Sequence, residues 1–244
     1  MNVKLIVEYD GTNYHGWQRQ KNAITIQETL EDALKVLLKK DISILGAGRT
    51  DSGAHARGQT ANFRVDELRI SPDRLPFALN NILPKDIQVK HAEQVPVDFH
   101  SSLWAKKKIY SYHIFNNRVS SPLLRNYSYH FPKALDIEKM RKAGGYLIGK
   151  QDFASFASAG SNVRTTVRQI MSFDIKRNGK LISATFKGDG FLYNMVRIMM
   201  GTLLIVGEGK VAPEHILYVI KSRKRELAGV TLPSKGLILE EVIY

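Results

Sequence analysis

The sequence predicts an α+β protein built from two halves of similar make-up, for three reasons. First, segments of period-two apolar residues, typical of strands, alternate with segments whose apolar residues recur at helical spacing. Second, several strand segments are joined by short turns, which favours a largely antiparallel sheet over a doubly wound parallel one. Third, each half reads roughly as strand, helix, strands and helix. We place the boundary near residues 101–105 and expect domains at 1–103 and 104–244 that share the sheet, with the helices on one side.

In the first half, the alternation over residues 3–9 predicts a strand. Thr25 followed by Glu28 fits a capping box, and the apolar residues behind it predict a helix that ends near Lys39. The stretch from Gly46 to Gly58 contains four glycines and is expected to form no regular element. The remaining expected elements are a helix with Pro72 at its first position and strands at 42–45, 59–65 and 87–95.

The second half contains the same kinds of element. We expect strands at 108–115 and 237–244, a helix after Asp136, a hairpin of 167–175 and 181–186 about Asn178–Gly179, a helix over 191–206, and a helix opened by Pro213.

The composition points to a polyanionic partner. The 244 residues include 36 Lys and Arg against 23 Asp and Glu, a net charge of +13. Such an excess favours nucleic acid first and an anionic membrane second. The absence of cysteine excludes disulfides, thiolate catalysis and Cys-ligated metals. Since neither a signal peptide nor a membrane-spanning segment is recognisable, we expect a cytoplasmic protein.

The densest group of chemically active side chains lies in the glycine-rich segment 46–58. It combines Asp51 with Arg49, Arg57 and His55, and its glycines permit close backbone approach by a ligand. On the local pattern alone the simpler interpretation is structural, because an Asp in a turn commonly forms an Asx-turn. His55 is either an acid/base partner of Asp51 or, as we favour, a residue that hydrogen-bonds backbone in its own loop.

A second candidate surface combines cations with aromatic rings. Lys108, Tyr110 and Tyr112 alternate along a strand and so project to one face. Cations beside aromatic rings can stack bases and contact phosphates, although solvated lysines and packed tyrosines are the structural alternative. Other basic pairs and clusters are Arg164 with Arg168, Arg19 with Lys21, and residues 221–225. Together with the net charge they favour nucleic-acid binding.

Arg197 lies within the apolar helix expected over 191–206. A buried arginine needs a carboxylate partner, which is either a structural Asp or Glu or the loop residue Asp51. In the second case the guanidinium would lower the pKa of Asp51 and keep it ionised. The seven histidines form no metal-binding motif, so the sequence gives no support to a metal site.

Four segments carry a family resemblance. Residues 48–56 read G-R-T-D-S-G-A-H-A, residues 108–112 read K-I-Y-S-Y, residues 195–197 read M-V-R with Gly201 following, and residues 9–18 read Y-D-G-T-N-Y-H-G-W-Q. Taken in their order along the chain, these segments resemble the motifs of the bacterial tRNA pseudouridine synthase A family over nearly the whole chain. One departure is Ala54, where the family usually has Val.

The resemblance implies isomerisation of uridine to pseudouridine at nucleotides 38, 39 and 40 of the tRNA anticodon stem-loop. It implies a homodimer without metal or cofactor, and two pseudosymmetric halves flanking a central basic cleft. The site residues that it implies are Asp51, Tyr110 and Arg197 for catalysis, and Arg49, Tyr110, Lys108, Arg164 and Arg168 for substrate binding. Arg49 would fill the gap left by the extruded base, and Tyr110 would stack on the uracil.

The chemistry leaves alternatives open. Asp51 is either a nucleophile, at ribose C1′ or uracil C6, or a base that forms a glycal intermediate. A non-catalytic RNA-binding module could use the same basic and aromatic surface. A hydrolase or phosphotransferase with Asp51 as acyl-phosphate nucleophile would need magnesium, and the sequence shows no carboxylate cluster to hold it.

Overall fold

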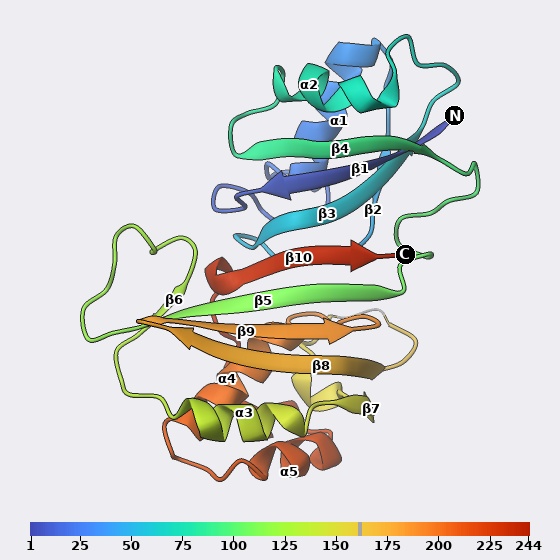
Figure 1. Ribbon diagram of the computed structural model, residues 1–244. Helices are drawn as coiled ribbons and strands as arrows, with labels where there is room; N and C mark the ends of the chain where they lie inside the picture. Colours follow the sequence, from blue (N-terminus) through green and yellow to red (C-terminus); the bar gives the residue numbers. More distant parts are fainter. Residues whose placement is uncertain (161–162) are drawn as a thin grey trace. The chain divides into compact units, whose positions relative to one another are not determined.

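The computed structural model describes residues 1–160 and 163–244. The chain divides into two compact units, Met1–Lys106 with Ile238–Tyr244, and Lys107–Leu237. The boundary expected after residue 103 lies close to the point after Lys106 where the chain passes into the second unit. The chain returns to the first unit at Ile238, so the last strand belongs to that unit. Both units combine strands with helices (Figure 1), which confirms the α+β class.

The sheet of the first unit is mostly antiparallel. Its strands, in spatial order, are β4 (Ile87–Val95), β1 (Asn2–Tyr9), β3 (His55–Arg64) and β10 (Leu237–Ile243), with β2 (Ile44–Gly46) also paired to β3. β1 runs antiparallel to both β3 and β4, β2 is antiparallel to β3, and β10 is parallel to β3. The helices are α1 (Ile26–Leu38) and α2 (Leu75–Asn80), and a 3₁₀ turn over Pro72–Arg74 precedes α2.

Alternation along β1 determines which side of this sheet is buried. Alternate residues of β1, Val3, Leu5 and Val7, are fully buried. The helices contribute further fully buried residues, Leu30 and Leu34 from α1 and Leu75 and Leu79 from α2. The predicted cap of α1 is confirmed, because the Thr25 hydroxyl accepts a hydrogen bond from the Glu28 amide at 3.3 Å. α1 ends where Lys39 adopts a left-handed φ of 57°.

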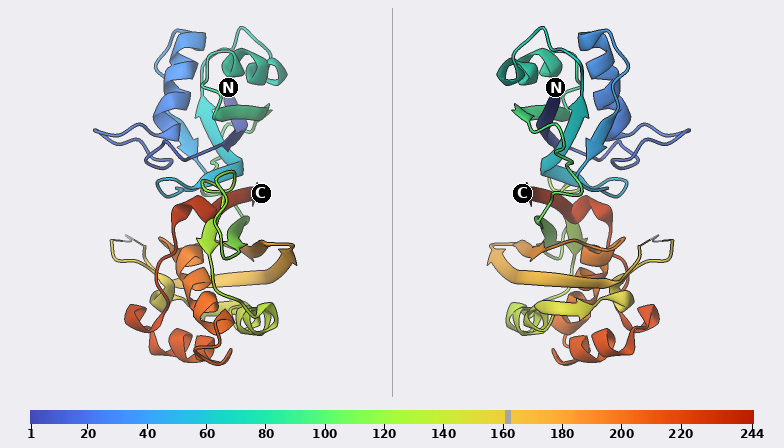
Figure 2. Two further views of the ribbon diagram at one scale, coloured as in Figure 1. Left: turned by 90° about the vertical axis from the view of Figure 1, so that its left-hand side faces the viewer. Right: turned by 90° about the vertical axis from the view of Figure 1, so that its right-hand side faces the viewer.

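In the second unit the strands follow the order β5 (Lys107–Asn116), β9 (Leu181–Gly188), β8 (Val167–Asn178) and β7 (Gly149–Asp152), with β6 (Tyr129–Phe131) parallel to β5. The other pairings are antiparallel. Its helices are α3 (Ile137–Gly145), α4 (Met195–Gly207) and α5 (His215–Ser222). Figure 2 shows α1 to one side of the first unit's strands and α4 to one side of β8 and β9.

Three expectations need correction. β3 begins at His55, so the stretch 46–58 is irregular only in its first part, because His55 and Ala56 already pair with β10. α4 begins at Met195 rather than at residue 191, because Asn194 has a left-handed φ of 61°. The short strands β6 and β7 were not expected. The hairpin about Asn178–Gly179 is confirmed.

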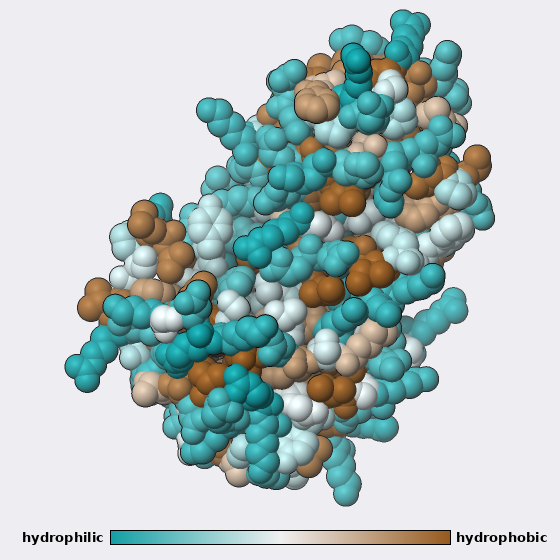
Figure 3. All heavy atoms as spheres, viewed as in Figure 1, coloured by the Kyte–Doolittle hydropathy of each residue, from teal (hydrophilic) through white to brown (hydrophobic). Residues whose placement is uncertain are grey.

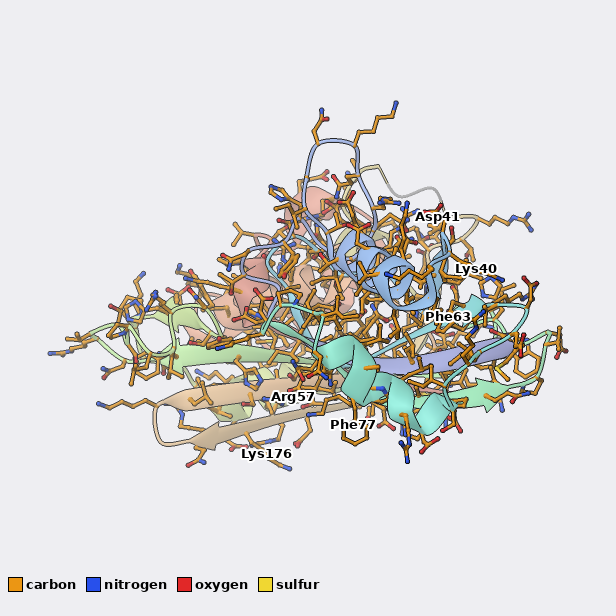
Figure 4. The ribbon with its side chains drawn as sticks, turned by 90° about the horizontal axis from the view of Figure 1, so that it is seen from above. Lys40, Asp41, Arg57, Phe63, Phe77 and Lys176 are labelled. Atoms are coloured by element: carbon orange, nitrogen blue, oxygen red, sulfur yellow. The ribbon has the colours of Figure 1, made fainter. Side chains whose placement is uncertain are left out.

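Polar and charged side chains cover most of the face shown in Figure 3, and apolar residues lie there in small groups. One of the exposed apolar residues is Phe77, which projects from α2 and is 75% exposed (Figure 4). Lys40 and Asp41 lie just beyond the C-terminal end of α1 in the same view. Within the described part of the chain, none of the helices has the length and apolar character needed to cross a bilayer.

Two adjacent glycines of α3 predict opposite effects on stability. A Cβ atom at Gly144 would lie 2.0 Å from the Phe173 ring, whereas a Cβ atom at Gly145 would meet no atom within 4 Å. Gly144→Ala should therefore lower the free energy of unfolding by about 1–3 kcal/mol. Gly145→Ala should raise it by about 0.5 kcal/mol, because alanine loses less backbone entropy in a helix.

Urea unfolding of the two variants beside the wild-type protein measures both effects. Equal destabilisation by the two substitutions would contradict the close packing of α3 on β8, because Gly145 serves as the matched control for helix propensity.

Candidate active site

Asp51 lies in the turn between β2 and β3, and its side chain is partly exposed. Its carbonyl oxygen accepts a hydrogen bond from the Ala54 amide at 3.0 Å, and Gly53 closes the turn with a φ of 75°. The neighbours Thr50 and Ala54 are buried. The backbone on both sides of Asp51 is thus anchored. We call residues 47–54 the Asp51 loop.

A second loop, residues 10–17, lies directly against the Asp51 loop, and we call it the backing loop. The Trp17 amide donates to the Thr50 carbonyl at 3.2 Å, and the Gly53 amide donates to the Tyr14 carbonyl at 3.1 Å. The Ser52 hydroxyl donates to the same Tyr14 carbonyl at 3.3 Å. Backbone groups that would otherwise need water are therefore satisfied between the two loops.

Two glycines make this close contact possible. A Cβ atom at Gly11 would lie 1.9 Å from the Ala54 carbonyl oxygen. Gly16 has a φ of 85°, and a Cβ atom there would lie 2.5 Å from the Thr50 carbonyl oxygen. Any other residue at either position would separate the loops, so the glycines of the segment 9–18 explain part of the pattern seen in the sequence.

Buried side chains hold the Asp51 loop from beneath. The hydroxyls of Tyr9 and Thr50 lie 2.7 Å apart. The side-chain amide of Gln59 donates to the Gly48 carbonyl at 2.9 Å. Trp17 is 2% exposed, and its indole fills the space beside Gly46, where a Cβ atom would lie 2.3 Å from Nε1. Buried groups therefore hold the backbone of this loop, although Arg49 and Ser52 are exposed.

His55 serves this packing through a backbone hydrogen bond. Its Nδ1 atom accepts from the Gly11 amide at 3.1 Å and lies 3.1 Å from the Asp10 carboxylate. A hydrogen bond between His55 and the backbone, the coarser part of the favoured interpretation, is therefore confirmed. The partner, however, belongs to the backing loop and not to the histidine's own loop.

In the second unit the aromatic and basic residues predicted from β5 share one face. The residues opposite Lys108, Tyr110 and Tyr112 on β9 are Gly188, Phe186 and Ala184, which are all buried. Because residues directly opposite in a sheet project to the same face, the predicted alternation is confirmed. Tyr112 is a packing residue, since its ring is fully buried and its hydroxyl donates to the Pro233 carbonyl at 2.7 Å.

Tyr110 is held by an aromatic partner that the sequence did not indicate. Its ring is 7% exposed and lies edge-on to Phe191, with centroids 5.1 Å apart and an interplanar angle of 77°. Phe191 also lies against Gly188, where a Cβ atom would be 3.2 Å from the ring. The missing side chain at Gly188 gives Phe191 the room to orient Tyr110.

Lys108 and Arg168 are electrostatic neighbours in this unit. Burial, and to a lesser extent the positive charge of Arg168, lowers the pKa of Lys108. Arg168 curls back on its own chain, since Nη1 donates to the carbonyls of Thr165 and Val167 at 2.9 and 2.6 Å. Arg164, in contrast, is exposed.

Arg197 lies in the first turn of α4, where backbone and side-chain acceptors orient its guanidinium. Nε donates to the Leu232 carbonyl and Nη1 donates to the Asn194 side chain, both at 2.6 Å. Asn194 also donates to the Ser158 hydroxyl at 2.9 Å. The side chain of Asn194, whose backbone is left-handed, thus links Ser158 to Arg197 and helps to fix the guanidinium. The pairing of Arg197 with Asp51 stays a prediction.

Of the other predicted site residues, Arg49 is exposed at the edge of the Asp51 loop. The sequence-based set missed Tyr9, Trp17, Phe191 and Asn194, which position the predicted residues. Buried aromatic residues inside a glycine-rich loop are the signal that could have indicated Trp17. Among residues 1–160 and 163–244, no group of three or more His, Cys, Asp or Glu side chains is arranged to hold a metal ion.

The first unit thus holds Asp51 on an anchored loop, and the second unit holds Lys108 and Tyr110 on one face of β5. Residues 5–102 and 143–244 match the family model of tRNA pseudouridine synthase. A tRNA pseudouridine synthase A of Acetivibrio thermocellus is 50% identical over 243 residues, which cover 100% of this chain and 99% of that protein. Proteins of the same name from Thermoanaerobacter sp. and Caldicellulosiruptor bescii are 46% and 45% identical with the same coverage. The chain belongs to the tRNA pseudouridine synthase family.

The environment of Lys108 predicts a trade-off between stability and RNA binding. Because the pKa of Lys108 is lowered in the folded state, the unfolded chain binds this proton more tightly, so the charge opposes folding at neutral pH. This unfavourable contribution fades as the pH rises towards the ordinary value of 10.5. Lys108→Met should therefore raise the thermal midpoint at pH 7, and it should weaken tRNA binding with a salt slope reduced by about 1.

Thermal unfolding at several pH values and tRNA titrations at several salt concentrations measure the two effects. Lys176→Met is the control for loss of charge, because Lys176 lies in the same unit with its side chain 79% exposed and should give no gain in stability. A lower midpoint for Lys108→Met, or an unchanged salt slope, would contradict the assignment.

Proposed function

We propose that the protein isomerises uridine to pseudouridine at nucleotides 38, 39 and 40 of the tRNA anticodon stem-loop, with Asp51 as the group that acts on the nucleotide. The observation that carries the proposal is a partly exposed carboxylate on a loop whose backbone is anchored on both sides. Catalytic groups require such fixed placement, since small displacements of a reacting group cost large factors in rate. Membership in the tRNA pseudouridine synthase family supports the same assignment.

The reaction exchanges one glycosidic bond for another without a change of oxidation state. The C1′–N1 bond breaks, the uracil turns in place, and a C1′–C5 bond forms. The proton on C5 is lost and N1 gains one, so the product is an isomer of the substrate. Asp51 can serve this sequence as a nucleophile at C1′ or C6, or as a base that gives a glycal. Both routes require the ionised carboxylate.

A uridine within a stem reaches Asp51 only after it leaves the base stack. Arg49, exposed two residues before Asp51, is suited to fill the gap, because a guanidinium both stacks on bases and contacts phosphate. Tyr110 is assigned to stacking on the extruded uracil, and its edge-on contact with Phe191 supports a fixed ring orientation. In this proposal Arg197 is the charge partner of Asp51, and its two hydrogen bonds at 2.6 Å support a preset guanidinium.

RNA affinity is assigned mainly to phosphate contacts from Lys108, Arg164 and Arg168. Action at several neighbouring nucleotides favours recognition of shape over recognition of base edges. The net charge of +13 fits such binding, which weakens with salt as counterions compete. We also assign to the protein a cytoplasmic location and a homodimeric state, with two pseudosymmetric halves sharing a sheet around a central basic cleft.

Removing the charge of Asp51 tests the proposal directly. Asp51→Asn should abolish release of tritium from tRNA labelled at uridine C5, a loss of at least about 10³-fold, while the tRNA dissociation constant stays within about twofold. Asp66→Asn is the control for loss of a carboxylate and should leave the rate within about twofold, because Asp66 belongs to the same unit and its side chain is 94% exposed.

Near-normal turnover by Asp51→Asn would exclude Asp51 as nucleophile or base. Failure of the wild-type protein to release tritium would instead favour a non-catalytic RNA-binding module. A hydrolase or phosphotransferase with Asp51 as acyl-phosphate nucleophile would need magnesium, so turnover that is insensitive to a chelator would exclude it.

The hydroxyl of Tyr110 is assigned a part in removing the C5 proton, separate from the stacking of its ring. Tyr110→Phe keeps the ring and its contact with Phe191, so KM for tRNA should change little while kcat falls by roughly 10²-fold. Single-turnover tritium release, with the enzyme in saturating excess over labelled tRNA, measures the rate of the chemical step without interference from product release. An unchanged rate in Tyr110→Phe would exclude a part for the hydroxyl in proton removal and leave stacking as the only role of Tyr110.

A further inference from the structure

A buried tyrosine outside the predicted site contacts the residue next to Asp51. Tyr9 ends β1, is 3% exposed, and packs beside Trp17 with ring centroids 6.1 Å apart. Its hydroxyl lies 2.7 Å from the Thr50 hydroxyl, across a sequence separation of 41 residues. Neither hydroxyl is needed to fill space, because phenylalanine and valine have nearly the same shapes.

Burial makes this pair of hydroxyls persistent. Thr50 is 7% exposed, so water does not compete freely for either group. The pKa of Tyr9 is raised because burial disfavours the phenolate, and the hydrogen bonds with the side chains of Thr50 and Gln59 offset this only in part. The phenol therefore keeps its proton, and a buried hydroxyl without its partner would pay the cost of desolvation.

Thr50 is fixed at two independent points, and both affect Asp51. The Trp17 amide holds the Thr50 carbonyl, which belongs to the peptide unit that joins Thr50 to Asp51. The Tyr9 hydroxyl holds the Thr50 side chain and so restricts rotation of the residue about its own backbone. With the Asp51 carbonyl bound to the Ala54 amide as well, the direction of the carboxylate depends mainly on its own two side-chain torsions.

We propose that Tyr9 is a positioning residue for Asp51, which acts through the Thr50 hydroxyl to set the direction from which the carboxylate meets the uridine. The inference rests on the proposed function, and it adds a residue that touches neither substrate nor reacting atoms. Groups of this kind matter because a loosely held catalytic side chain loses rate while binding is preserved.

A double-mutant cycle tests the proposal. Tyr9→Phe and Thr50→Val each remove one hydroxyl and should each slow single-turnover tritium release by roughly tenfold, with KM for tRNA within about twofold. Because the two hydroxyls act as one unit, Tyr9→Phe/Thr50→Val should be no slower than either single variant by more than about twofold. Thr50→Ser, which keeps the hydroxyl, should restore most of the rate.

Tyr244→Phe is the matched control. The Tyr244 hydroxyl also donates over 2.7 Å, to the Ser101 carbonyl within the same unit, but Ser101 lies outside the Asp51 loop. Its removal should lower the thermal midpoint as Tyr9→Phe does and leave the rate within about twofold, since a hydroxyl lost from elsewhere in the unit affects stability only.

A wild-type rate for Tyr9→Phe, or a double variant slowed by the product of the two single effects, would overturn the proposal. If the wild-type protein releases no tritium, the proposed function fails, and the amide NMR shifts of Asp51 and Ser52 then decide the positioning role. They should move in Tyr9→Phe and in Thr50→Val but not in Tyr244→Phe. Unmoved shifts in all three variants would overturn it independently of activity.

Discussion

The contact between the backing loop and the Asp51 loop is the constraint on which the proposed site depends. Asp51 belongs to a turn, a kind of segment that is ordinarily mobile. Here backbone hydrogen bonds from Trp17 and to Tyr14 hold the turn in place. Gly11 and Gly16 allow the approach, because a Cβ atom at either position would overlap carbonyl oxygens of the Asp51 loop. The backbone that carries the partly exposed Asp51 side chain is thereby fixed.

In the second unit, packed neighbours likewise fix the orientation of two predicted site residues. Tyr110 and Arg197 both take their orientation from residues close to the start of α4. Phe191 packs edge-on against Tyr110, and Asn194 accepts a hydrogen bond from Arg197 while its backbone adopts a left-handed conformation. Burial lowers the pKa of Lys108, so a positive charge at this position opposes folding.

Local signals in the sequence predicted much of this structure. The Thr25 cap, the alternation of β1 and the Asn178–Gly179 turn each depend on residues close in the chain, and each is confirmed. The early start of β3 and the contact between Tyr9 and Thr50 depend on partners far along the chain, which no local pattern reveals. Likewise, the motif letters identified Asp51 as a candidate, but only the packing shows what holds its loop.

Amide hydrogen exchange in the wild-type protein tests most directly whether the Asp51 loop is preformed. The amides of Trp17, Gly53 and Ala54 all donate to backbone carbonyls within the first unit. They should therefore exchange slowly in the free protein, and binding of tRNA should change their protection by less than about threefold. Rapid exchange in the free protein that slows only when tRNA binds would contradict the account, because the RNA and not the backing loop would then order the site.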